Sequence, residues 1–244
     1  HLQDFTMIEG YGAYLNYRDN LKFLREMLQS IIMNIFGTLE INVGDKVVDL
    51  SGEWEDISFR DLILKYSDID INVYNTKELL LQKIREDKIE IDSETPLENL
   101  GYGNLVDQLY KKIARPYIIN PVFLTKHPIS FSPLARANDS DPTITDRFQL
   151  VINGAEIINA YSELVDPIEQ EKRLLEQARL KANGDEESMP MDYDYIDAIE
   201  YGMPPISGWG MGIDRLVQLL TNSANIKDVV LFPLMKNKED ITND

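Results

Sequence analysis

Glycine occupies every second position in one segment near the end of the chain, at Gly208, Gly210 and Gly212. Because strand side chains alternate between two faces, these glycines leave one face of a predicted strand over 207–212 bare. Such a strand is weak unless something lies close against that face. The segment leads into a predicted helix with Arg215 in its first turn, and a guanidinium there suits a triphosphate. The unit therefore predicts a site for a flat ligand with phosphate groups.

The clearest turn signal is Asn153-Gly154, a dipeptide that favours a type I′ turn. We predict a hairpin whose strands cover 146–152 and 155–163. A two-residue turn brings Gln149 diagonally next to Glu156, close enough for the two long side chains to converge.

Three side chains further along the second strand alternate on one face: Asn159, Tyr161 and Glu163. Strict alternation puts Glu156 on the opposite face from these three. Two interpretations remain open. Either a β-bulge lies between Glu156 and Asn159, or the two groups do not share a site. Taken alone, the three residues could equally form an exposed polar face.

The start of the chain alternates as a strand over 5–15, with Phe5, Met7, Glu9 and Tyr11 on one face. A carboxylate and a phenol beside an apolar pair are poor core residues. We predict that this face lines a pocket.

The rest of the pattern is mainly helical, which predicts an α+β fold. We predict helices over 18–36, 59–66, 77–89, 105–114 and 167–182, a hairpin over 38–50, a strand over 117–124 and a polar loop over 130–142. His127, Trp54 and Trp209 are interpreted as structural residues, and the carboxylates of 185–187 as solvated.

Composition narrows the function classes. The net charge of −18 repels phosphate backbones, so a nucleic acid partner needs local basic groups or another domain. The sequence has no cysteine, which excludes thiolate chemistry and fits a reducing cytoplasm. No apolar run is long enough to span a bilayer, and no membrane partner is expected. The chain begins with His1 rather than Met, so we expect it to belong to a longer protein.

Four segments together carry a family resemblance: His1 with Phe5–Glu9, Ser132–Arg136, Glu156–Leu164, and Gly208–Ser223 with Leu231–Pro233. The first is similar to the return strand of motif 2, and the last to motif 3, of the class II aminoacyl-tRNA synthetases in their lysine-specific form. The resemblance implies an antiparallel β-sheet flanked by helices, the class II catalytic fold. It implies one partial domain over 1–244, truncated at its N-terminus, with a helical insertion at about 52–115.

The resemblance also gives roles to the matching positions. Lysine would be bound by Glu9 at its α-amino group, by Asn159 at its carboxylate, by Tyr161 along its methylene stem, and by Tyr11 and Glu163 at its ε-ammonium. A carboxylate and a phenol suit a buried ammonium, where an unpaired charge is costly. The same pocket argues against the related aspartate and asparagine enzymes.

For ATP, the resemblance implies that Phe5 stacks on the adenine, that Arg215 binds the γ-phosphate and that Glu156 holds Mg²⁺. The expected catalytic residues are Arg215 and Glu156, and the full set of expected ATP-binding residues is His1, Phe5, Glu156, Ile157, Gly208, Gly210, Gly212 and Arg215. The implied reaction activates lysine with ATP and transfers it to tRNA(Lys), in a cytoplasmic enzyme that is a homodimer at full length. It needs no protein nucleophile, since placement and charge neutralisation supply the catalysis.

The sequence departs from the family at two points. Gln149 stands where the family usually has glutamate; its amide oxygen can still coordinate a metal but brings no charge, so one magnesium site should be weaker. The motif 2 arginine and motif 1 are expected upstream of His1, and we expect this chain alone to be poorly active or inactive. Two alternatives stay open: an inactive lysine- or nucleotide-binding module, and a synthetase-like enzyme that ligates lysine to a protein.

Overall fold

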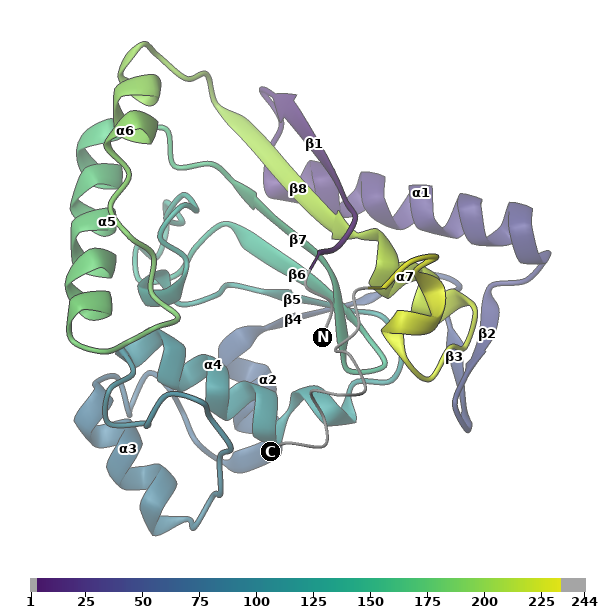
Figure 1. Cartoon of the computed structure of the whole chain (residues 1–244), viewed down its shortest axis with the longest axis horizontal. Helices are drawn as coiled ribbons and strands as arrows, with labels where there is room; N and C mark the ends of the chain where they lie inside the picture. The colour runs from purple at the N-terminus through teal and green to yellow at the C-terminus, as the bar shows by residue number, and fades with distance from the viewer. Residues whose placement is uncertain (1–3, 234–244) are drawn as a thin grey trace.

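The computed structural model describes residues 4–233 and has an α+β fold, as predicted (Figure 1). A mixed six-stranded sheet has the order β1-β8-β7-β6-β5-β4, and β2 and β3 form a separate hairpin. The strands are β1 (Met7–Ala13), β2 (Glu40–Val43), β3 (Lys46–Asp49), β4 (Glu55–Ser58), β5 (Val122–Thr125), β6 (Arg147–Ile152), β7 (Ala155–Ser162) and β8 (Ile206–Gly212). The helices are α1 (Tyr17–Phe36), α2 (Phe59–Ser67), α3 (Lys77–Glu86), α4 (Tyr102–Ile113), α5 (Pro167–Ala182), α6 (Tyr193–Glu200) and α7 (Ile213–Leu220).

Helix α1 covers one face of the sheet (Figure 1). It begins after Asn16, whose side chain caps the first turn, and ends at Gly37, where φ is 69°. Leu24, Leu28 and Ile32 are buried at helical spacing and pack against the central strands. The predicted helix over 18–36 is confirmed.

The β6–β7 hairpin has the predicted turn, with positive φ angles of 46° and 70° at its two turn residues. Val151 lies opposite Glu156, as expected, but Leu150 lies opposite Ile158. Ile157 is therefore an extra residue in β7, which makes a β-bulge. Of the two interpretations left open by the sequence, the bulge is confirmed.

Strand β4 pairs with β5 in parallel, so the prediction of an antiparallel sheet is wrong at this edge. Parallel neighbours need a long crossover connection, and α2, α3 and α4 form it. These helices bury Phe59 against Leu124 and Val151, and so cover the β4–β6 half of the face opposite α1. The β1–β8–β7 half stays accessible, with Tyr11 61% exposed.

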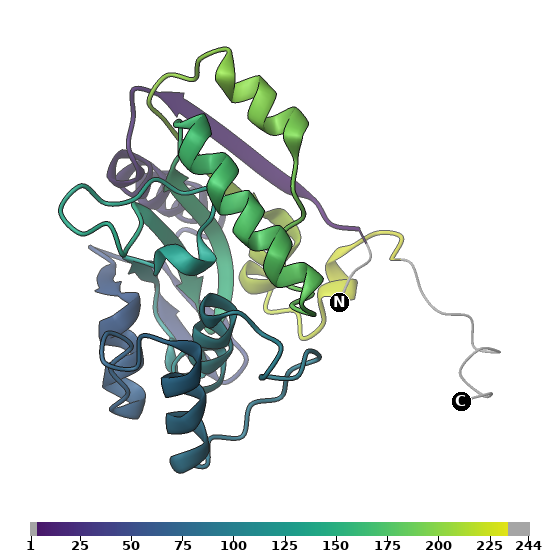
Figure 2. The ribbon, with the colours of Figure 1, turned by 90° about the vertical axis from the view of Figure 1, so that its left-hand side faces the viewer.

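Helices α5 and α6 lie side by side at the end of the sheet where β7 ends and β8 begins (Figure 2). The loop between them carries Asp185, whose fully buried carboxylate accepts hydrogen bonds from Gly101 N at 2.7 Å and Asn104 Nδ2 at 2.9 Å. Gly101 precedes α4 and has no side chain, and Asp185 anchors the start of the helix from a distant loop through the Gly101 N–H and the Asn104 side chain. The prediction of solvated carboxylates over 185–187 is wrong for Asp185.

The register places Gly10 opposite Trp209 on the α1 side of the sheet, and the indole ring covers the glycine. A Cβ on Gly10 would lie 2.5 Å from Trp209 Cζ2. We expect Gly10→Ala to lower the free energy of unfolding by about 1–3 kcal/mol, the usual range for overpacking, in urea denaturation. In a Trp209→Leu background the same change should cost much less, because the ring is gone. Equal costs in both backgrounds would show that the ring contact is not the cause.

Candidate active site

The strand register arranges the predicted site residues in rows across the open face. In one row, Tyr11 of β1 and Tyr161 of β7 lie on either side of Gly208 of β8. In the next row, Glu9 and Asn159 lie on either side of the following glycine of β8. Because glycine has no side chain, residues from strands that do not touch can meet above β8. The bare face predicted from the glycine spacing is thus partly covered by side chains of β1 and β7.

Gly208 lies directly beneath a carboxylate and a phenol. A Cβ built on Gly208 would lie 2.5 Å from Tyr11 Cε1 and 2.6 Å from Glu163 Oε1. The Tyr11 hydroxyl donates to Glu9 Oε2 at 3.1 Å, so a second carboxylate joins the group. Tyr11, Glu163 and Glu9, predicted to bind one ligand, therefore lie together. The space they share exists only because position 208 is glycine.

Glu163 is buried, only 6% exposed. Burial raises its pKa to about 7, because the charged form loses hydration. Within residues 4–233, no cation or hydrogen-bond donor pairs with its carboxylate. Burial also raises the pKa of Tyr161 and of Tyr11, so both phenols stay protonated. The pocket is anionic above neutral pH and suits a cationic group.

The other end of the face suits phosphate. Arg215, in the first turn of α7, donates from Nη1 to the backbone oxygen of Glu156 at 3.1 Å. Above Gly212 the face is open, since an added Cβ would have no neighbour nearer than Arg215 Cδ at 3.8 Å. Phe5 is 68% exposed beside this region, just before β1. Ile157 points into the α1 core, so only its backbone is available on this face.

The start of α7 is tied to the chain just before β1, because Asp214 Oδ2 accepts a hydrogen bond from Thr6 N at 2.6 Å. This bond holds the helix that carries the candidate phosphate-binding arginine against the first strand. Met7 covers the middle of the face, with its Cε 2.9 Å from the position of a Cβ on Gly210. An occupant above Gly210 therefore requires this flexible side chain to move. His1, also predicted to contact ATP, lies outside the described residues.

The bulge brings Glu156 next to Gln149, and Gln149 Nε2 donates to Glu156 Oε2 at 2.9 Å. The predicted convergence of these two side chains is confirmed. Across residues 4–233, no group of three His, Cys, Asp or Glu residues could hold a metal ion. The half-buried carboxylate of Glu156 can offer oxygen to a cation.

Sequence reasoning missed Arg147, which lies on the same face, opposite Tyr161. Its Nε donates to Asn159 Oδ1 at 3.0 Å, and its Nη1 to Ser132 Oγ at 2.9 Å. Burial lowers the pKa of Arg147. Because the Asn159 oxygen is turned toward Arg147, its amide nitrogen is free to donate to a ligand. Strand alternation with Gln149 could have placed Arg147 on this face; the hydrogen bond could not have been foreseen.

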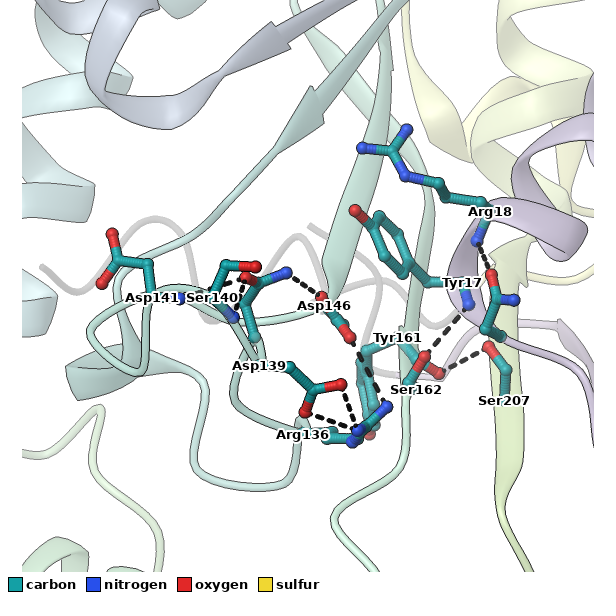
Figure 3. Close-up of polar contacts among 12 residues, drawn as sticks. Tyr17, Arg18, Arg136, Asp139, Ser140, Asp141, Asp146, Tyr161, Ser162 and Ser207 are labelled. Carbon is teal, nitrogen blue, oxygen red and sulfur yellow. Dashed lines mark hydrogen bonds and ion pairs between the residues drawn. The ribbon is translucent and has the colours of Figure 1, made fainter.

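The end of β7 is held in place from the side facing α1 (Figure 3). Ser162 Oγ accepts from Tyr17 N at 3.0 Å, and Ser207 Oγ donates to the backbone oxygen of Tyr161 at 2.8 Å. On the loop side, Arg136 N donates to Ser162 O at 2.8 Å. These bonds fix the backbone between Tyr161 and Glu163, two residues that face the pocket.

A sequence profile of the tRNA synthetases class II (D, K and N) matches residues 1–236. The chain therefore belongs to the class II tRNA synthetases. It is similar to the lysine–tRNA ligase of Dehalococcoides mccartyi, with 41% identity over 241 residues, 98% of this chain and 47% of that protein. It is 40% identical over 236 residues to the lysine–tRNA ligase of Thermosipho africanus, covering 97% of this chain and 45% of that protein. For the lysine–tRNA ligase of Staphylococcus epidermidis the identity is 40% over 238 residues, 98% of this chain and 47% of that protein.

The chain spans about half the length of these curated relatives. The family membership supports the class II catalytic fold predicted from the sequence, apart from the parallel strand β4. Among the helices of residues 4–233, none combines the length and apolarity required to cross a membrane.

Glu163→Gln should stabilise the folded chain above neutral pH. The pKa of Glu163 rises from 4.5 to about 7 on folding, so the wild type loses up to about 3 kcal/mol of unfolding free energy as pH rises between these values. Glutamine has no proton to lose and stays uncharged at every pH, so it does not pay this cost. We expect the variant to be more stable than wild type at pH 8 and nearly equal at pH 4.5, in urea denaturation without ligand. A stability difference that does not change with pH would contradict the desolvation argument.

Proposed function

We propose that this chain is the catalytic core of a lysine–tRNA ligase, which uses ATP to activate lysine and transfers it to tRNA(Lys). The observation that carries the proposal is the buried Glu163 carboxylate, which has no cationic partner within residues 4–233 and lies beside Tyr11 above Gly208. A buried anion without a partner is costly, and an ammonium group from a ligand would offset that cost. The similarity to lysine–tRNA ligases supports the same choice of substrate.

At the lysine end, Glu163 and Tyr11 would hold the ε-ammonium, and Tyr161 would pack along the methylene stem. Asn159 would donate its free amide N–H to the lysine carboxylate, and Glu9 would accept from the α-amino group. The pocket would then offer one carboxylate to each amino group of lysine, Glu9 to the α-amino group and Glu163 to the ε-ammonium. The ring of Tyr161 would lie between them. This pattern favours a long diamine acid over a short or neutral one.

At the nucleotide end, Arg215 would bind the γ-phosphate, and the exposed ring of Phe5 is free to stack on adenine. Glu156 would offer a ligand to Mg²⁺ that enters with ATP, and His1 and the backbone of Ile157 complete the proposed contacts. Of the glycines of β8, we assign Gly210 and Gly212 to the surface beneath the nucleotide. Gly208 belongs also to the lysine pocket, because Tyr11 and Glu163 cover it.

In the first step, a carboxylate oxygen of lysine attacks the α-phosphorus of ATP, the bond to the bridging oxygen breaks, and pyrophosphate leaves. In the second, a ribose hydroxyl at the 3′ end of the tRNA attacks the carbonyl carbon of lysyl-adenylate, the bond from that carbon to the phosphate oxygen breaks, and AMP leaves with the hydroxyl proton passing to its phosphate. Arg215 neutralises phosphate charge, and Asn159, Glu9 and Glu163 hold the nucleophile in position. Mg²⁺ bound with ATP would further neutralise the phosphates.

The proposal extends to the whole protein. We propose a cytoplasmic homodimer, in which the region over 1–244 is one class II catalytic domain. The helices α2 to α4 would form the insertion at about 52–115. The acidic charge of the chain, −18, leaves it poorly suited to attract tRNA by itself, so another part of the protein would supply most of that contact.

Isothermal titration calorimetry at pH 8 tests the lysine assignment. We expect binding of lysine but not of norleucine, which has the same stem without the ammonium. Glu163→Gln should weaken lysine binding by roughly 30- to 5,000-fold, the range for breaking a buried charge pair, and Tyr11→Phe by about tenfold for one hydrogen bond. Equal affinity for norleucine and lysine would contradict the proposal.

An ATP–pyrophosphate exchange assay separates an enzyme core from an inactive binding module. Lysine-dependent exchange that is lost in Arg215→Ala supports the enzyme, because Arg215 is the proposed γ-phosphate ligand. Lysine binding with no exchange in a full-length protein that contains this region would favour the inactive module; weak exchange by the chain alone would not, because the chain alone is expected to be poorly active. Exchange that does not depend on lysine would overturn the substrate assignment.

A further inference from the structure

Both ends of the Gln149 side-chain amide are already used inside the protein. Its Nε2 donates to Glu156 Oε2 at 2.9 Å, and its Oε1 lies 3.1 Å from His127 Nε2. Gln149 is only 6% exposed and His127 is fully buried. The three side chains therefore form a line of hydrogen bonds that runs from the interior to the open face at Glu156.

The chemistry of the groups fixes the direction of this line. An ionised carboxylate accepts but cannot donate, so the amide nitrogen must face Glu156 and the amide oxygen must face His127. An amide oxygen also only accepts, so His127 carries a proton on Nε2. The rings of Phe59 and Phe131 pack against the imidazole, with centroids at 5.1 and 5.7 Å, and hold it in this position.

We propose that Gln149 is a positioning residue for Glu156 and not a metal ligand. Its oxygen, the atom that could bind a cation, is turned away from the open face and engaged by His127. A divalent cation in this site would therefore have Glu156 as its ligand from the β6–β7 hairpin and would complete its coordination with phosphate oxygens and water. The inference rests on the proposed nucleotide site.

The test counts the water molecules bound to Mn²⁺, which replaces Mg²⁺, in the complex with α,β-methylene-ATP. Electron paramagnetic resonance in oxygen-17-labelled water gives this count without turnover. In Gln149→Met, an uncharged side chain of similar length, we expect about 10–100-fold weaker Mn²⁺ binding, as for loss of a residue that orients a ligand. The number of bound waters should equal that of wild type, because no ligand has been removed.

Glu156→Ala is the matched control. It removes the proposed ligand, so it should weaken Mn²⁺ binding and add one water. An extra water in Gln149→Met would show that the amide oxygen coordinates the cation, and would overturn the proposal. No extra water in Glu156→Ala would also overturn it, since Glu156 would then not be a ligand.

Equilibrium dialysis first measures whether the wild type binds α,β-methylene-ATP. This result separates a failure of the proposed function from a failure of the role given to Gln149. If the wild type binds no nucleotide, the proposed function fails and this inference fails with it. If nucleotide binds normally and only the water counts disagree, the role given to Gln149 is wrong and the proposed function stands. Melting temperatures of the variants without cation identify any general loss of folding.

Discussion

The β-bulge at Ile157 is the constraint on which both ends of the candidate site depend. The turn of the hairpin sets the pairing near Glu156, while α1 requires Ile158 to face the core. Without the extra residue, alternation would put Glu156 and Ile158 on the same face and Asn159 on the other. Ile157 absorbs the mismatch, and its own side chain is buried against α1, so core packing stabilises the irregularity. The proposed lysine pocket and the proposed phosphate end can then share one surface.

Strand β8 shows how the fold supports that surface. Its glycines give up side-chain packing on the site face, which weakens a strand. On the opposite face, Trp209 and Met211 alternate with the glycines and pack into the α1 core. The glycine of β1 beneath the Trp209 ring allows the indole to lie flat along the neighbouring strand. One face of β8 thus provides stability, and the other provides room for a ligand.

Much of this could be predicted from the sequence, because it depends on local rules. Capping residues, the Asn-Gly turn and alternation locate α1, β1 and the hairpin, and alternation groups Glu9 with Tyr11 and Asn159 with Tyr161 and Glu163. The family resemblance then assigns these two groups to one pocket. The burial of His127 and Asp185 depends on partners far along the chain, which no local pattern reveals. For Arg147, alternation gives the face but not the hydrogen bond to Asn159. Strand β4 has only four residues, two of them acidic, so its sequence carries no strand pattern. It is a strand because its backbone pairs in parallel with β5. The sequence could not decide between a β-bulge in β7 and two separate groups of residues, because no residue type identifies the extra residue of a bulge.

The desolvated carboxylate of Glu163 makes occupancy of the pocket a proton-linked event. Near neutral pH a fraction of empty sites carries a proton on this group, because its pKa is about 7. A ligand that arrives as a cation needs the ionised form, so its binding expels that proton to solvent. The heat of binding will then include the ionisation heat of the buffer, and the apparent affinity will fall as the medium becomes more acidic. Hydrogen ion and the proposed cationic substrate would therefore compete for one carboxylate.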